Sequence, residues 1–444
     1  MEKKMAYLDA YETYLRQIEE DIANIDTLRK HLVFGYTSNL DVIFKWDIEK
    51  FNRILDEFLP EKPTGDTEDI INSMEDFARI TSGYLIKGMG GSIEVSDIAV
   101  CEYLENAFDL EYGLGGNGAQ GAAALGALGI PVVVQLTDRS PEVCQKLEHG
   151  DIRLVDEQGQ LVSVKGHAQK EPPLYHMILQ FTKGDKLKIR GKEYDIPVSN
   201  RLILFCDSVH KSVPVPDYFL RYLEEHPCDI SAYLVAGFDA VVDKQIMQER
   251  LDTLCPHYER LKKANPDFVL YFEGADYMNL DVKELLYRSI SRYVDILGMN
   301  EEELDTQLRR FGKVLDKESL PSVLDGLRAM LHRFPVCGIV LHTKDYAMYF
   351  GSRLPGIDIE KGLTIGNLMS ATRARLGSYG SLKMCSDSLK MDLSRAGLRF
   401  FEELSQMQLD EYVCLVPSRY LEKPKYTIGL GDTFVAGVHT SFLK

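Results

Sequence analysis

The segment TIGLGDTFVAGVHTSF, residues 427–442, combines a tight turn with a carboxylate. Gly429 and Gly431 bracket Leu430, Asp432 follows directly, and apolar residues four apart in the next turns predict a helix. Glycines let the backbone approach a ligand closely, and the free N–H groups of a helix N-terminus favour an anion. Phosphoryl transfer requires such an anion site beside a carboxylate that accepts a hydroxyl proton. An equally good interpretation is a glycine turn with Asp432 as an ordinary helix N-cap.

Two further segments place acidic or amide side chains after apolar strands. LGMNEEEL, residues 297–304, contains Asn300 and Glu303, and YFEGA ends its strand at Glu273. Beside an active site, Asn300 and Glu303 could hold Mg²⁺ directly or through water. The same N-x-x-E spacing is typical of a capping box at any helix start, and Glu273 could be an ordinary solvated loop acid.

A third group of polar residues is suited to binding hydroxyl groups. Its members are Asn39, Asp41, Glu94, Asn117 and His176, all in glycine-rich or loop-like settings. Each one alone would be interpreted as a turn or cap residue. Their occurrence together with GLGD favours a polyhydroxylated ligand.

Composition and charge exclude several classes of function. The 444 residues carry 51 Lys and Arg against 68 Asp and Glu, a net charge of −17, so nucleic acid and anionic membranes are not expected as partners. The 8 cysteines are scattered without a C-x-x-C pair, which indicates reduced thiols and a cytoplasmic protein. The first residues lack the apolar core of a signal peptide, and no apolar run approaches the ~20 residues of a membrane span.

The elements that must position these residues are those of an α/β protein. From about residue 201 onward, short apolar strands alternate with helical segments of 10–20 residues, which predicts a mostly parallel sheet. Residues 6–31 predict an amphipathic helix, and residues 114–137 predict a glycine loop, a helix of small residues and a buried strand. Ligands of open α/β sheets bind at the carboxyl ends of the strands, where several of the polar segments are expected.

The quoted motifs together resemble one family. GGNGAQGA, HMILQF, NRLI, YFEGA, ILGMNEEEL, LHT and VPS…KPKYTIGLGDTF occur in this order over roughly residues 31–440. They resemble the ADP-dependent glucokinases and phosphofructokinases, which belong to the wider ribokinase-like fold. GLGDT alone would indicate only a ribokinase-like kinase, whereas the combination with HMILQF, NRLI and LGMNEEEL is much more specific to the ADP-using branch.

The resemblance implies a role for each motif. Asp432 would be the catalytic base that receives the sugar hydroxyl proton, and Gly429 and Gly431 would shape the anion hole. Magnesium would be organised by Glu273, Asn300 and Glu303. The sugar would be bound by Asn39, Asp41, Glu94, Gly116, Asn117 and His176. Arg201 of NRLI would hold a phosphate of ADP, and the rest of the nucleotide site would comprise His342, Thr343, Val416, Pro417 and Leu430. The cofactor would be Mg²⁺ or another divalent cation, with ADP as co-substrate, and the protein would be a monomer or a small homo-oligomer.

The resemblance also implies a ribokinase-like architecture, an α/β fold of two domains. A large domain with a mostly parallel central sheet flanked by helices would comprise approximately residues 1–34, 48–83, 115–160 and 200–444. A small β-rich lid would comprise approximately residues 35–47, 84–114 and 161–199. The lid would close over the sugar and exclude water from the reaction.

This sequence departs from the family pattern at two positions. Tyr271 stands where the family often has the histidine of H-x-E, and Gln180 replaces the glutamate of H-x-I-x-E-F. The missing histidine leaves open a sugar- or nucleotide-binding homologue that has lost turnover. An ATP-dependent ribokinase-like sugar kinase is a separate alternative.

The acceptor is open as well. Glu94 resembles a glutamate of glucose-using members, which favours glucose. The basic strand with Lys186, Lys188 and Arg190 could instead bind a sugar phosphate, or its charges could simply protect a sheet edge.

Overall fold

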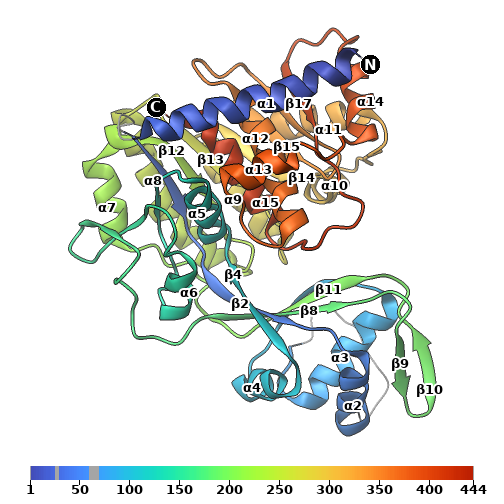
Figure 1. Ribbon diagram of the computed structural model, residues 1–444. Helices are drawn as coiled ribbons and strands as arrows, with labels where there is room; N and C mark the ends of the chain where they lie inside the picture. Colours follow the sequence, from blue (N-terminus) through green and yellow to red (C-terminus); the bar gives the residue numbers. More distant parts are fainter. Residues whose placement is uncertain (1, 26–29, 60–69, 444) are drawn as a thin grey trace.

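The computed structural model describes residues 2–25, 30–59 and 70–443, which form a large and a small α/β body (Figure 1). The large body is built on a sheet whose described strands are, in spatial order, β17 (Tyr412–Pro417), β16 (Tyr346–Gly351), β15 (Gly338–His342), β14 (Ile296–Asn300), β13 (Val269–Glu273), β12 (Ile230–Val235), β1 (His31–Gly35), β5 (Val132–Val134), β6 (Ile152–Val155) and β7 (Leu161–Ser163). Strands β15 to β6 in this order are parallel, and antiparallel pairs occur only towards the edges, at β16, β17 and β7, among the described strands. The prediction of a mostly parallel sheet is confirmed.

Helices cover both faces of this sheet, which explains why its strands are continuously apolar. One face packs against α1 (Glu2–Ala23), α5 (Asn117–Leu128), α6 (Pro141–Lys146), α12 (Ile359–Leu376), α13 (Leu382–Ser388) and α15 (Leu430–Val438). The other face packs against α7 (Asp217–Glu225), α8 (Lys244–Ala264), α9 (Leu280–Ile290), α10 (Glu301–Arg310), α11 (Leu320–Arg333) and α14 (Arg395–Leu404). The helix predicted over residues 6–31 ends at Ala23, and residues 26–29 of that prediction lie outside the described part of the chain.

The small body contains a second sheet and its own helices. Its described strands are ordered β3 (Gly91–Glu94), β11 (Asn200–Phe205), β8 (Tyr175–Phe181), β2 (Asn39–Phe44) and β4 (Leu110–Gly115), with a hairpin of β9 (Lys186–Ile189) and β10 (Lys192–Asp195) beside it. Helices α2 (Ile48–Phe58), α3 (Met74–Lys87) and α4 (Ile98–Ala107) pack on this sheet. Figure 1 shows β2 and β4 running from the large body into the small one.

The structure corrects the expected boundaries of the two bodies. Residues 48–83 were expected in the large domain, but Phe51 of α2 and Phe77 of α3 belong to the apolar cluster of the small sheet, together with Val42. Strand β11 also lies in the small sheet rather than the large one, and β7 lies at the edge of the large sheet. Helical periodicity shows that a segment has an apolar face, but it does not show which of two sheets that face covers.

Among the described residues, the structure has no helix that combines the length and the apolar character needed to cross a bilayer.

Candidate active site

Two cavities meet at the N-terminus of α15. Cavity A, of about 210 Å³, is lined by Asp432 and Gly429 of the GLGD segment and by residues of both bodies. Cavity B, of about 480 Å³, is lined by Leu430 and Gly431 of the same segment and lies entirely against the large body. The first and last residues of the GLGD turn therefore face cavity A, and the two residues between them face cavity B.

The turn before α15 is held by a buried arginine of α12. Arg373 donates to the backbone oxygen of Gly429 (3.0 Å), to Thr433 Oγ1 (2.8 Å) and to Gln120 Oε1 (2.7 Å). Gly429 has φ +65°, and a Cβ atom there would collide with Gln120 Oε1, so only glycine fits. The backbone of the anion site is thus rigidly placed between α12, α5 and α15. Neither Arg373 nor Gln120 was identified from the sequence, because no motif marks a buried arginine in a distant helix.

Asp432 is not a helix N-cap, so that interpretation is wrong. Gly429 occupies the cap position, and Asp432 lies in the first turn of α15. Its Oδ1 accepts a hydrogen bond from Asn117 Nδ2 (2.7 Å), at the start of α5. Burial raises the pKa of Asp432, while the nearby Arg373 guanidinium opposes this change. A carboxylate with a raised pKa is a better proton acceptor, and this one faces cavity A.

Most residues expected to bind the sugar do line cavity A. They are Asn39 and Asp41 of β2, Gly116 and Asn117 at the start of α5, and His176 of β8. Asn39 Nδ2 donates to Asp41 Oδ1 (2.7 Å), and burial raises the pKa of Asp41. Gln120, His210 and Asp239 also line the cavity but were not identified from the sequence. Their position directly after predicted strands or a glycine loop was the available signal.

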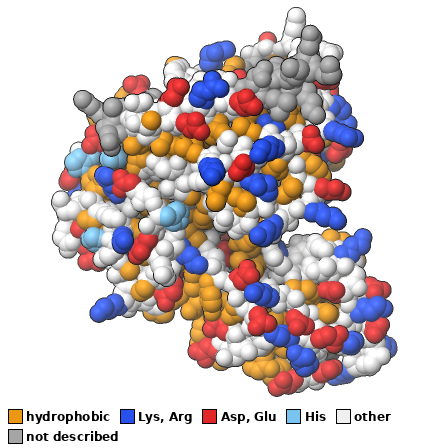
Figure 2. All heavy atoms as spheres, in the orientation of Figure 1, with side chains coloured by type: hydrophobic (Ala, Val, Ile, Leu, Met, Phe, Trp, Pro, Cys, Tyr) orange, Lys and Arg blue, Asp and Glu red, His pale blue; other side chains and the backbone are white. Residues whose placement is uncertain are grey.

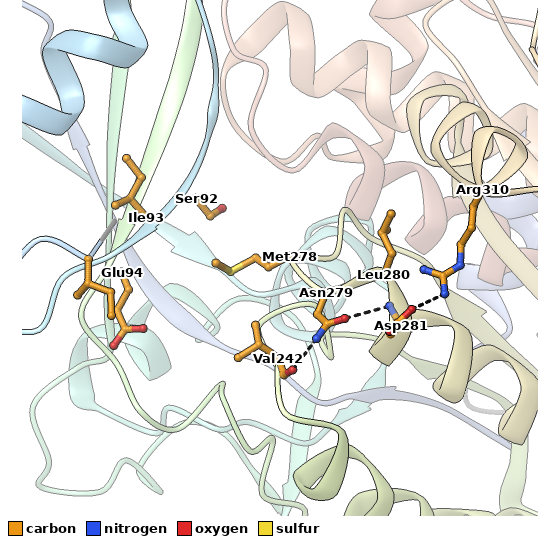
Figure 3. A pocket seen from close by; sticks show the side chains of 10 residues that line it. Ser92, Ile93, Glu94, Val242, Met278, Asn279, Leu280, Asp281 and Arg310 are labelled. Atoms are coloured by element: carbon orange, nitrogen blue, oxygen red, sulfur yellow. Dashed lines mark hydrogen bonds and ion pairs between the residues drawn. The ribbon is translucent and has the colours of Figure 1, made fainter. Parts of the chain in front are cut away.

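Glu94 is separated from this group by the structure. It lines a different cavity of about 460 Å³, called cavity C, between β3 of the small body and α9 of the large one. Figure 3 shows Ser92, Ile93 and Glu94 on one side of this space and Met278 and Asn279 on the other, and Figure 2 shows a notch between the two bodies. The Glu94 carboxylate forms an ion pair with Lys211 Nζ (2.5 Å), so its charge is already compensated.

The basic residues of the β9–β10 hairpin do not form a free cationic surface. Lys186 pairs with Glu193 (3.1 Å) and lies 3.8 Å from Asp195, and Lys188 pairs with Glu49 (3.0 Å). Arg190 lies in the turn of the β9–β10 hairpin, with φ +50°. These pairs support the interpretation that the charges protect a sheet edge.

The expected nucleotide residues divide between the two cavities. His342, Thr343 and Leu430 line cavity B, as expected. Arg201 lies instead in cavity A, on β11 of the small sheet opposite Gln180.

Val416 and Pro417 are not among the described residues that line cavity B. This corrects the expectation that they form part of the nucleotide site. They are the last residues of β17, and Val416 is fully buried. The wall of the cavity is formed by the residues that follow, from Ser418 to Glu422. The ligand-facing residues begin where the strand ends, because the sheet itself buries the strand residues.

Three titratable residues, Glu273, Glu303 and His342, form a buried cluster beside α15. Glu273 Oε1 lies 2.8 Å from His342 Nε2, and Glu273 Oε2 has no hydrogen-bond partner among the described residues. Burial and the neighbouring charge of Glu273 raise the pKa of Glu303 to about 7. Burial also raises the pKa of Glu273. For His342, burial lowers the pKa, but the neighbouring Glu273 carboxylate outweighs this effect, so the pKa of His342 is raised overall.

The capping-box interpretation of Asn300 is confirmed. Its side chain accepts from the backbone N–H of Glu302 and Glu303, and Glu303 accepts from the backbone of Asn300. The Asn300 amide nitrogen also donates to Glu303 Oε1 (2.6 Å). Asn300 therefore orients Glu303 towards the cluster.

The Glu273–Glu303 pair fits a divalent cation. One buried carboxylate oxygen of Glu273 lacks a partner among the described residues, and the charge of Glu273 raises the pKa of Glu303, so a cation between them would remove an unfavourable charge interaction. Glu273 and Glu303 are the direct candidates, and the amide of Asn300 is already used by the capping box.

This cluster predicts a pH dependence of stability in the absence of divalent cations. Because the folded-state pKa of Glu303 is raised, folding favours its protonated form, and stability falls as pH rises from about 4.5 to about 7. The contribution of this one group is roughly 3 kcal/mol. Urea denaturation at pH 5 and pH 7.5 should show this loss in the wild type and a smaller loss in Glu303→Gln.

Glu302→Gln, which changes the exposed neighbour, is the matched control and should behave like the wild type. Adding Mg²⁺ at pH 7.5 should restore stability to the wild type more than to Glu303→Gln. A wild-type pH profile identical to that of Glu303→Gln would contradict the prediction.

Comparison with known proteins gives a consistent result. The family model described as "ADP-specific Phosphofructokinase/Glucokinase conserved region" matches residues 30–440. An ADP-specific phosphofructokinase of Pyrococcus furiosus is 23% identical over 95% of this chain and 98% of its own length. An ADP-dependent glucose/glucosamine kinase of Pyrococcus abyssi is 23% identical over 98% of this chain and 97% of its own.

The fold is shared with solved structures. One is an ADP-dependent kinase in complex with fructose-6-phosphate and ADPβS, with a TM-score of 0.77, 20% identity, and coverage of 98% of each chain. This likeness confirms the predicted α/β fold class.

Proposed function

The chain belongs to the ADP-specific phosphofructokinase/glucokinase family, and from this premise we propose that it transfers the β-phosphoryl group of ADP to a hydroxyl of a hexose. The products are the sugar phosphate and AMP. The acceptor is glucose or fructose 6-phosphate, the two sugars that the resemblance indicates.

The observation that carries this proposal is the position of the α15 N-terminus between two cavities. Asp432 faces cavity A, where Asn39, Asp41 and His176 offer hydrogen-bonding groups for a sugar. Leu430 and Gly431 face cavity B, which has the size for a nucleotide. A hydroxyl in cavity A and a phosphate from cavity B would meet at the free N–H groups of one helix.

In the proposed reaction, Asp432 takes the proton of the sugar hydroxyl as that oxygen attacks the β-phosphorus. The bond from the β-phosphorus to the bridging oxygen breaks, and AMP leaves with the electron pair. The N–H groups at the start of α15 stabilise the charge on the transferring group, and Arg373 holds these groups in place. The proton on Asp432 then passes to solvent.

Magnesium is part of the proposal, with Glu273 and Glu303 as the residues that would hold it. Bound Mg²⁺ would neutralise charge on the phosphates. Tyr271 replaces a histidine of the family pattern, but His342 of β15 contacts Glu273 in this structure. A histidine therefore still stands beside this glutamate, which argues against a lost activity.

The small body is proposed to act as a lid. Cavity A takes residues from both bodies, including Arg201 from the small sheet and Asp432 from the large body. Movement of the small body towards the large one would carry Arg201 towards the phosphates and exclude water from the reaction. Cavity C would narrow in the same movement.

Choice of the phosphoryl donor tests the proposal. Cavity B ends at the α15 turn, so a third phosphate would extend into cavity A and compete with the acceptor. We expect kcat/KM with ADP to exceed that with ATP by at least ~100-fold, which corresponds to about 2.7 kcal/mol. The measurement is AMP or ADP formation with Mg²⁺ and a panel including glucose and fructose 6-phosphate.

A reaction without sugar controls for hydrolysis of the nucleotide. Equal efficiency with ATP would favour the ATP-dependent ribokinase-like kinase instead. Sugar and nucleotide binding without any product would favour a binding protein. Turnover of glucose alone or of fructose 6-phosphate alone would identify the acceptor.

A further inference from the structure

Two histidines and one aspartate converge at the wall of cavity A. His176 Nε2 lies 2.9 Å from Asp207 Oδ2, His210 Nδ1 lies 2.7 Å from the same oxygen, and the two nitrogens are 3.3 Å apart. Strand pairing creates this cluster, because His176 of β8 lies opposite Phe205 of β11, two residues before Asp207. Among the residues that the structure describes, it is the group of His, Cys, Asp and Glu side chains that meets the spacing of metal ligands.

The three atoms have the geometry of ligands around one ion. Their separations leave a point about 2.0–2.1 Å from all three, just outside their plane, and this is the usual length of a bond from Zn²⁺ to histidine nitrogen or carboxylate oxygen. Without an ion, the three side chains would have to hydrogen-bond to one another, and that arrangement is less favourable than the shared coordination of one ion. The same distances put the two nitrogens only about 70° apart as seen from Asp207 Oδ2, so two N–H donors would crowd one oxygen.

The other ring nitrogen of His210 shows which of its nitrogens carries a proton. Thr137 Oγ1 accepts from the backbone N–H of Ser38 (2.9 Å) and donates its one hydrogen to the Ser38 carbonyl (3.0 Å). His210 Nε2, 2.9 Å from Thr137 Oγ1, must therefore be the donor in that contact. In the neutral ring, Nδ1 then has a lone pair directed at the cluster, which is the form that binds a metal.

The surroundings complete the pattern of a metal site. Histidine ligands usually donate their second N–H to a neighbouring oxygen, and ligating carboxylates are themselves hydrogen-bonded. His210 donates to Thr137, and Asp207 Oδ1 accepts from the backbone N–H of His210 (2.9 Å). The side chains of Asp207 and His210 are 0% and 5% exposed, so both ligands are buried at the wall of cavity A.

From this geometry we propose that His176, Asp207 and His210 bind one divalent cation of the zinc class. Two imidazoles with one carboxylate suit Zn²⁺, Co²⁺ or Ni²⁺ and not Mg²⁺, which prefers oxygen ligands. Three protein ligands leave one position open, and His176 and His210 both line cavity A. The open position takes a water or an oxygen of the ligand in that cavity. The proposal does not depend on the proposed kinase activity, but it assigns His176 Nε2 to the ion, so His176 would contact a sugar through the bound ion instead of by a hydrogen bond from that nitrogen.

Metal binding by the full-length protein tests the proposal without nucleotide or sugar. The chelator-treated protein is titrated with Zn²⁺ by calorimetry and with Co²⁺ by visible absorption, both in excess Mg²⁺ to occupy acidic sites. We expect one equivalent of either metal per chain and the visible bands of four-coordinate Co²⁺. His210→Gln and Asp207→Asn should each weaken binding at least ~100-fold, and Thr137→Val should weaken it ~10-fold.

His226→Gln is the matched control. His226 and Asp229 have the same spacing along the chain as the Asp207–His210 pair, but they are exposed and their charged atoms are 3.5 Å apart. This variant should bind like the wild type. Circular dichroism on each variant checks that it is folded, and Thr137→Val leaves all three ligands in place.

If wild-type protein binds Zn²⁺ and Co²⁺ no more tightly than His210→Gln, a proton takes the place of the ion and the proposal is wrong. The same holds if binding persists unchanged in both His210→Gln and Asp207→Asn. Because no sugar or nucleotide is present, either failure would leave the proposed kinase activity untouched.

Discussion

Replacing Asp432 with asparagine should lower kcat by at least ~100-fold, the lower range for loss of a general base. The substitution keeps the shape of the side chain and the contact with Asn117, because the amide oxygen of the new side chain can still accept from Asn117 Nδ2. What it removes is the capacity to accept a proton in cavity A. Sugar affinity and thermal stability should therefore change little, while turnover falls.

The experiment compares steady-state kinetics, sugar binding by calorimetry and thermal unfolding in the wild type and in Asp432→Asn. Asp387→Asn, which neutralises an acid paired with Lys390 outside both cavities, is the control for a change in net charge. Near-normal turnover in a correctly folded Asp432→Asn protein would rule out the proposed base. Lost sugar binding would instead make Asp432 a binding residue.

Replacing Arg373 with methionine should lower both turnover and stability. Arg373 is 3% exposed, and its guanidinium lies 4.2 Å from the centre of the Tyr379 ring as well as binding Gly429, Thr433 and Gln120. Methionine keeps much of the apolar stem but leaves buried oxygens without their donor, which should cost about 3 kcal/mol of unfolding free energy. Because the anion site then loses its fixed position, we expect kcat to fall by ~100-fold.

Arg375→Met is a matched control on the same helix. Arg375 is partly exposed and binds Ser388 Oγ and the Met384 carbonyl, both at 3.2 Å and outside cavities A and B. Urea denaturation and steady-state kinetics should show a clearly smaller effect for this variant. Equal losses in the two variants would mean that Arg373 stabilises α12 generally and does not position the α15 turn.

Much of the fold was accessible from the sequence because local patterns determine local structure. Continuous apolar strands alternating with amphipathic helices predicted a parallel sheet, and the structure confirms it. The turn at Gly429 and the helix after it were also predictable, since only glycine adopts φ +65° at that position without strain. The capping box at Asn300 is likewise a matter of four consecutive residues.

Contacts between distant segments were not accessible in this way. The sequence placed residues 48–83 in the large body, because their helical pattern says nothing about which sheet they cover. It placed Val416 and Pro417 at the nucleotide, although β17 buries Val416 and the cavity wall starts after the strand. The sequence also could not show that Lys186 and Lys188 are paired, because their partners Glu193 and Glu49 lie on other elements.

The sequence by itself therefore determined the class of fold, the glycine turn with its carboxylate, and the family to which these motifs point. Only the tertiary structure decided that Asp432 faces one cavity while Gly431 faces another, that Arg373 holds their turn, and that His176 meets Asp207 and His210. The physical reason is that backbone conformation and periodicity depend on neighbours along the chain, whereas cavities, buried charge pairs and ligand clusters depend on which strands and helices become neighbours in space.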